Sequence, residues 1–177
     1  MTDGWQRCFI ALAPSAATRD ALAAVPVAST ARRVPYEQLH LTVTFIGALS
    51  AGHGEALARA LTAHAVPLAP AAIERIEHWP NANRPRLTEA TLAMSDEFVA
   101  LAWRIRSLML ELGLPVDARA FRPHITLARF GREAAAIDDV YMTVPEVIVR
   151  FESLVLYSST LARHGARYSA LASVPLA

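Results

Sequence analysis

The pattern of apolar and polar positions along the chain predicts a mixture of helices and strands. The clearest helix covers residues 95–112, where Ser95 can cap the first turn and apolar residues recur every three to four positions. Further helices are expected at residues 16–25 and 52–65. Strands are predicted at residues 7–13, 39–46, 71–79, 86–94, 115–120, 123–130, 147–157 and 166–173.

The order of these elements indicates the fold class. Several strands follow one another with only short connections, which is typical of antiparallel pairing. Together with the helices, this order predicts an α+β fold. The chain of 177 residues is long enough to bury a core, and we expect residues 1–177 to form a single domain with two lobes that face each other.

Composition excludes several kinds of chemistry. All 17 basic residues are arginines, so the chain has no lysine for a Schiff base, a P-loop or a covalent nucleotidyl intermediate. The single Cys8 excludes a disulfide framework and a thiolate metal cluster. The apolar run near the N-terminus is stopped by Pro14 and is too short for a signal peptide or a membrane span. We therefore expect a cytoplasmic protein, and nothing in the pattern suggests more than a monomer.

Two strands carry nearly the same polar interruption. Residues 39–46 read LHLTVTFI, and residues 123–130 read PHITLARF. On a strand, residues i and i+2 point to one face, so each segment presents a histidine and a threonine together while its apolar residues face a core. Chance produces two such motifs in a chain of this composition with a probability of only about 1%. The repetition therefore indicates a shared function.

The four polar residues of these motifs are His40, Thr42, His124 and Thr126. If the two strands line one cleft, the imidazoles, with ordinary pKa values of ~6.5, can supply one base and one acid near neutral pH. The threonine hydroxyls can donate hydrogen bonds to phosphate oxygens as charge develops on them. The chain has no residue spacing typical of a metal site, so we expect neither a metal nor another cofactor.

These motifs resemble the paired HxTx motifs of the two-histidine (2H) phosphoesterase superfamily. With Pro123 before the second motif and Ala128 and Arg129 after it, the chain looks most like the RNA 2′,3′-cyclic phosphodiesterases, historically named 2′-5′ RNA ligases. The resemblance implies a bilobal, pseudo-symmetric α+β fold, in which two antiparallel sheets flank a central cleft and helices lie outside. It also implies metal-independent hydrolysis of a 2′,3′-cyclic phosphate, on RNA 3′ ends or small cyclic nucleotides, to a 2′-phosphomonoester. Any 2′-5′ joining would be the reverse of this reaction.

The resemblance also implies roles for individual residues. His124 is expected to be the general base that activates water, and His40 the acid that protonates the 3′ oxygen. Thr42 and Thr126 are expected to hold the phosphate. Arg129 is the usual arginine after the second motif, expected to contact phosphate or the nucleobase. Strict alternation places Arg129 on the opposite strand face from His124, so it can serve only if the strand bends or ends there.

Other residues are candidates for the site or for its walls. Phe9, in the first strand, can stack on a nucleobase. Thr88 and Glu89 lie where relatives tend to be more apolar, which predicts a more exposed strand or an altered cleft wall. Tyr36 and Arg122 are further candidates because they lie beside the two motifs. The remaining histidines are expected at the surface: His53, His64, His78 and His164.

Two functions other than RNA-end hydrolysis are also compatible with these motifs. The enzyme could act on a small nucleotide such as an ADP-ribose cyclic phosphate, or the cleft could bind RNA ends without turnover. The net charge of +1 argues against long non-specific contact with nucleic acid, which generally needs a basic face. It fits a site that binds only an RNA terminus or a free nucleotide.

Overall fold

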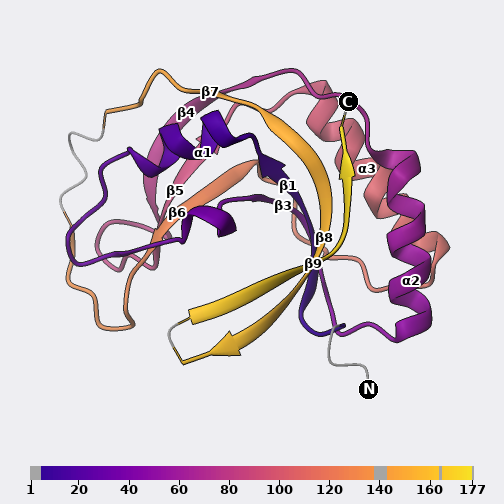
Figure 1. Ribbon diagram of the computed structural model, residues 1–177. Coiled ribbons are helices and arrows are strands. Elements are labelled where there is room, and N and C mark those ends of the chain that lie inside the picture. The colour runs from indigo at the N-terminus through magenta and orange to yellow at the C-terminus, as the bar shows by residue number, and fades with distance from the viewer. Residues whose placement is uncertain (1–4, 138–142, 164, 177) are drawn as a thin grey trace.

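The computed structural model describes residues 5–137, 143–163 and 165–176 (Figure 1). Of the histidines expected at the surface, His164 lies outside these ranges. The elements in chain order are β1 (Cys8–Pro14), α1 (Ala16–Ala23), β2 (Arg32–Arg33), the 3-10 turn η1 (Tyr36–Gln38), β3 (Leu41–Gly47), α2 (Ala51–Ala60), the 3-10 turn η2 (Leu61–His64), β4 (Ala71–Trp79), β5 (Leu87–Leu92), α3 (Asp96–Glu111), β6 (His124–Arg129), β7 (Ile148–Val149), β8 (Phe151–Ala162) and β9 (Gly165–Pro175).

The strands of the described residues pair in the order β7-β4-β5-β6-β3-β1-β8-β9, and β2 adds to β6. All of these pairings are antiparallel, which confirms the α+β class. The two expected sheets are joined rather than separate. Their junction is narrow, because β3 and β6 share a single paired position, Leu41 with Ile125, whereas β1 and β8 pair at six.

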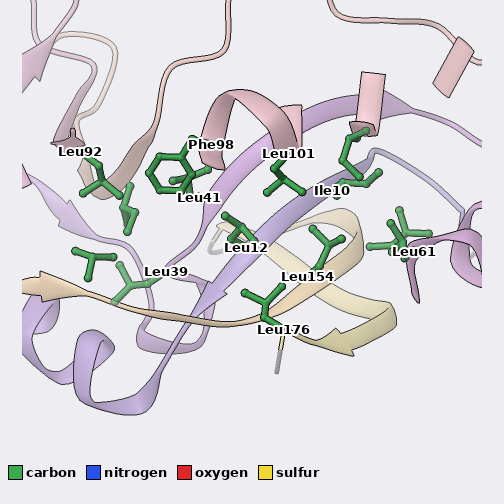
Figure 2. Packing of buried hydrophobic residues seen from close by; sticks show 14 of the residues in the cluster. Ile10, Leu12, Leu39, Leu41, Leu61, Leu92, Phe98, Leu101, Leu154 and Leu176 are labelled. Atoms are coloured by element: carbon green, nitrogen blue, oxygen red, sulfur yellow. The ribbon is translucent and has the colours of Figure 1, made fainter. Parts of the chain in front are cut away.

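A continuous apolar core lies behind the sheet. Ile10 of β1, Leu41 of β3 and Leu154 of β8 belong to one buried cluster with Phe98 and Leu101 of α3, as Figure 2 shows. Each of these side chains is at most 2% exposed. Burying a side chain of this size stabilises the fold by about 1.5–3 kcal/mol. The core therefore holds the strands that carry the two motifs in place through their apolar face.

The helix ends follow the local sequence signals. Ser15, Ser50 and Ser95 each precede a helix and accept a hydrogen bond from a backbone N–H three residues later. These contacts satisfy donors that the first helical turn leaves without a partner. The predicted capping role of Ser95 is therefore confirmed. No helix in the described part of the chain is both long and apolar enough to cross a membrane.

The structure differs from the sequence-based expectations at several places along the chain. Residues 115–120 form no strand, because this segment has no neighbouring strand to pair with among the described residues. The two-residue strand β2 was not predicted, since its pairing with β6 is a long-range contact. His78 is buried in β4, 8% exposed, rather than at the surface, and its Nδ1 lies 3.0 Å from the hydroxyl of Thr88.

Candidate active site

The narrow junction between β3 and β6 brings the two motifs together. Leu41 and Ile125 are 0% exposed and point into the core, so the residues on either side of them point to the opposite face. In an antiparallel pair, i+1 on one strand opposes j−1 on the other. His40 is therefore placed across from Thr126, and Thr42 across from His124. The structure thus assembles the predicted quartet on one face of the sheet.

The two imidazoles are held in the same way. Nδ1 of His40 lies 2.6 Å from the carbonyl oxygen of Gln38, and Nδ1 of His124 lies 2.7 Å from that of Arg122. Because a carbonyl oxygen can only accept, each Nδ1 carries the proton and donates it. The neutral tautomer then leaves the lone pair on Nε2. In His40 this Nε2 lies 3.0 Å from Oγ1 of Thr42, whose hydroxyl can donate to it.

His40 is packed among aromatic rings. The ring centroids of Phe9 and Tyr168 lie 5.1 and 5.5 Å from that of His40, and the ring of Tyr157 lies 6.3 Å away. Burial lowers the pKa of His40 from its ordinary 6.5 to about 4, against the opposing hydrogen bond to Gln38. The nearby charge of Arg129 lowers the pKa further. In the free protein His40 is therefore neutral at neutral pH.

His124 lies beside a carboxylate instead. The side chain of Glu89 is 0% exposed, and its Oε2 is 3.7 Å from Nε2 of His124. The guanidinium of Arg122 donates to both Glu89 oxygens, at 2.5 and 3.2 Å. The expectation that Thr88 and Glu89 make a more exposed strand is wrong, because both are buried, at 1% and 0% exposed. Glu89 lines a cavity together with His124.

Arg129 reaches the same side as His124, and the reason is a β-bulge. Thr88 pairs with Ala128, but the next residue of β5, Glu89, pairs with Thr126, so Leu127 is an extra residue in β6. The extra residue reverses the alternation beyond it: Leu127 and Ala128 are both buried, and Arg129 is exposed. Arg129 could serve the site only if its strand bends or ends there, and the bulge at Leu127 provides this bend.

The four motif residues line one pocket of about 800 Å³. Arg129, Phe9 and Tyr168 also line it. Phe9 contributes little surface, because it is only 4% exposed and packs on the rings of His40, Tyr157 and Tyr168. This burial argues against Phe9 as a stacking surface for a nucleobase and gives it a supporting contact with His40 instead.

A second cavity of about 750 Å³ adjoins this pocket and shares His124 and Thr42 with it. Its walls carry three exposed aromatic side chains, Phe45, Trp79 and Trp103. We call it the aromatic groove, and the first cavity the histidine pocket. Within residues 5–137, 143–163 and 165–176, no group of three or more His, Cys, Asp or Glu side chains is arranged to hold a metal ion.

Some residues of the site were not predicted, and one candidate lies elsewhere. Arg32 and Tyr168 both line the histidine pocket. The adjacent arginines Arg32 and Arg33, shortly before the first motif, are a sequence signal for Arg32, whereas Tyr168 has no such signal. Tyr36 lines neither cavity; its hydroxyl donates to Oδ1 of Asp20 at 2.8 Å. Arg122 lines the aromatic groove and holds Glu89.

Comparisons with known proteins agree with this architecture. The family model described as LigT like Phosphoesterase matches residues 92–168, which include the second motif. The solved structure of TT0787 from Thermus thermophilus is 29% identical, with a TM-score of 0.73, over 96% of this chain and 97% of its own. E. coli LigT, solved in complex with 3′-AMP, is 26% identical, with a TM-score of 0.75, over 97% of this chain and 98% of its own. A search of curated proteins finds no match.

The chain thus combines an antiparallel α+β fold with two HxT strands that meet in one pocket. Together with the matches above, these features make the chain similar to the LigT-like phosphoesterases of the 2H superfamily. These likenesses support an enzyme that acts on phosphate esters.

Proposed function

We propose that this enzyme hydrolyses 2′,3′-cyclic phosphates at RNA 3′ ends to 2′-phosphomonoesters. The observation that carries the proposal is the matched pair of imidazoles. Each is held through Nδ1 by a backbone carbonyl, and both line one pocket that also contains Thr42 and Thr126. Because both histidines come from one chain, the reaction needs no second copy, which fits a monomer with one catalytic domain.

The cyclic phosphate would lie over the Leu41–Ile125 junction. There the hydroxyls of Thr42 and Thr126 can donate to its non-bridging oxygens, and the guanidinium of Arg129 can balance its charge. Donors that are held in place before the reaction stabilise the extra negative charge of the transition state without reorganisation.

The chemistry then needs one proton taken and one proton given. His124 takes a proton from water as the water oxygen forms its bond to phosphorus, and the bond from phosphorus to the 3′ oxygen breaks. His40 gives its proton to that 3′ oxygen, which leaves a 3′ hydroxyl and a 2′-phosphomonoester. The surroundings support this assignment, because Glu89 can stabilise the imidazolium formed at His124, while Arg129 makes a proton on His40 easier to release.

His40 must acquire its proton with the substrate. Its pKa of about 4 leaves it neutral in the free protein at neutral pH. A phosphate anion beside Nε2 favours the charged imidazolium and raises this pKa on binding. The acid form is therefore assembled only when a phosphate occupies the pocket.

The comparisons support a nucleotide ligand but leave its size open. The structures of E. coli LigT include complexes with 3′-AMP, NADP+ and ATP. A small cyclic nucleotide, such as an ADP-ribose cyclic phosphate, is the alternative substrate within the same chemistry. Binding of RNA ends without turnover is the alternative outside it.

Phosphorus NMR of 2′,3′-cyclic AMP incubated with the protein tests the proposal. We expect conversion to the 2′-phosphate, with the His40→Ala, His124→Ala double variant as the control without activity. A 3′-phosphate product would show that the other ester bond is broken. Absence of any product from 2′,3′-cyclic AMP and from a short RNA with the same end would favour the binding module and reject the enzyme.

A further inference from the structure

The histidine pocket is far more basic than the reacting phosphate requires. Its lining includes Arg7, Arg32, Arg33 and Arg129, and no aspartate or glutamate among the described residues. None of these four arginines forms an ion pair with a carboxylate within residues 5–137, 143–163 and 165–176. In the aromatic groove, by contrast, Arg119 pairs with Asp117, and Arg122 pairs with Glu89.

Two of these arginines face each other across paired strands. Arg32 of β2 is the register partner of Arg129 of β6, and both side chains are exposed. Neighbouring strands lie only about 4.8 Å apart, and like charges directly opposite each other destabilise a strand pair. An anion between the two guanidiniums would turn this repulsion into two charge-assisted hydrogen bonds.

The missing side chain of Gly165 leaves room for the guanidinium of Arg32 beside the pocket. This guanidinium lies against Gly165, where a Cβ atom would come within 2.6 Å of Nη2. Gly165 has a φ of +122°, a conformation that other residues rarely adopt. It begins β9 at the end of the β8–β9 hairpin, which projects beyond the rest of the sheet (Figure 1), and it lines the pocket. Arg33 is engaged elsewhere, because its Nη2 donates to the carbonyl oxygen of Val25 at 2.5 Å.

We propose that Arg32 and Arg129 bind a second phosphate of the substrate, the one attached to the 5′ oxygen of the nucleoside that carries the cyclic phosphate. This inference rests on the proposed function, since it places the reacting phosphate between His40 and His124. Two sources share this chemistry: the backbone phosphate of an RNA chain and the 5′-phosphate of a free nucleotide. Either one makes a cyclic mononucleotide without a 5′-phosphate a poor substrate.

The test compares kcat/KM for three substrates. These are 2′,3′-cyclic AMP, the same compound with a 5′-phosphate, and the dinucleotide ApA that ends in a 2′,3′-cyclic phosphate. We expect the second phosphate to raise kcat/KM about tenfold or more, the usual scale of a charge-assisted contact. A gain for the dinucleotide indicates RNA ends as the source, and a gain for the 5′-phosphate alone indicates a free nucleotide.

Arg32→Gln should reduce this substrate preference about tenfold. The matched control is Arg59→Gln, because Arg59 is an exposed arginine of α2 outside both cavities, and this variant should keep the preference of the parent protein. Equal kcat/KM values for all three substrates in the parent protein, or an unchanged preference in Arg32→Gln, would overturn the second phosphate site.

A binding measurement keeps this inference separate from the proposed function. Calorimetry can compare 2′-AMP with adenosine 2′,5′-bisphosphate, neither of which has to react. We expect the bisphosphate to bind about tenfold or more tightly, and the advantage to disappear in Arg32→Gln. This result would support the second phosphate site even if no cyclic phosphate is hydrolysed, whereas equal affinities would reject the site even in an active enzyme.

Discussion

The two histidines of the pocket share a local frame but differ in their surroundings. Both donate Nδ1–H to a carbonyl two residues earlier, and both have a threonine two residues later. His40 is packed against aromatic rings and near Arg129, whereas His124 lies beside the buried carboxylate of Glu89. The repeated motif therefore sets the geometry, and the neighbours that are not repeated make the two halves unequal in charge.

This inequality matters because acid–base catalysis needs two different histidines. Two identical imidazoles would titrate together, and at any pH only part of the molecules would carry one proton on the correct ring. Positive charge near His40 favours release of its proton. The carboxylate of Glu89 lies beside His124 instead. Each prediction below changes His40, His124 or a group that acts with one of them.

Removing either imidazole should have the largest effect. We expect His40→Ala and His124→Ala each to lower kcat for cyclic phosphate hydrolysis by about 10²- to 10⁴-fold, because each removes one proton transfer. His53→Ala is the matched control, since His53 is exposed at the start of α2 and lines neither cavity. A near-normal rate in either site variant would contradict the two-histidine mechanism.

A substrate with a different leaving group distinguishes the acid role of His40 from the base role of His124. In a cyclic substrate with sulfur in place of the 3′ oxygen, the departing thiolate needs no protonation. We expect His40→Ala to recover roughly 10²-fold of its lost rate on this substrate, and His124→Ala to stay inactive, because water must still lose a proton. Recovery in His124→Ala instead would exchange the acid and base roles.

The burial of His40 should also appear in the stability of the fold. Its pKa is about 4 in the folded protein against an ordinary 6.5, so between these values the unfolded chain binds a proton that the folded chain does not. The stabilisation is therefore present above pH ~6.5 and is lost as the pH falls through about 4, a change of about 3 kcal/mol.

Urea unfolding at pH 7 and pH 4 measures this effect. Acidification should cost the parent protein about 3 kcal/mol more free energy of unfolding than it costs His40→Asn, in which position 40 no longer titrates. The exposed His53→Asn variant should behave like the parent protein. An equal loss in His40→Asn and the parent protein would mean that His40 is not held in its neutral form.

The sequence was sufficient to predict the part of the site that depends on local pattern. Alternation along each strand places His40 with Thr42 and His124 with Thr126, and the apolar residues between them need a core on the other side. This pattern also predicts the α+β class, because each strand is defined by its own neighbours in the chain.

The features that make the two sides unequal could not be predicted in this way. The bulge at Leu127 that turns Arg129 into the pocket depends on the register between β5 and β6. The burial of Glu89 depends on Arg122, which is 33 residues away in the chain. Both are long-range contacts, and a strand pattern contains no information about which strand will lie beside it.

The smallest expected effect concerns the carboxylate on the His124 side. Glu89→Gln keeps the shape of the side chain but removes the negative charge 3.7 Å from Nε2 of His124. We expect kcat to fall about tenfold, equivalent to about 1.4 kcal/mol of transition-state stabilisation. The control is Glu74→Gln, because Glu74 is a half-exposed acid of β4 that lines neither cavity.

The sulfur-containing substrate shows which side Glu89 serves. If Glu89 stabilises the proton that His124 takes from water, the tenfold loss in Glu89→Gln should persist on that substrate, because the base is still needed. A loss that disappears there would place Glu89 on the acid side. A loss of stability in urea with kcat unchanged would instead restrict Glu89 to holding Arg122, and the charge difference between the two histidines would then have no part in catalysis.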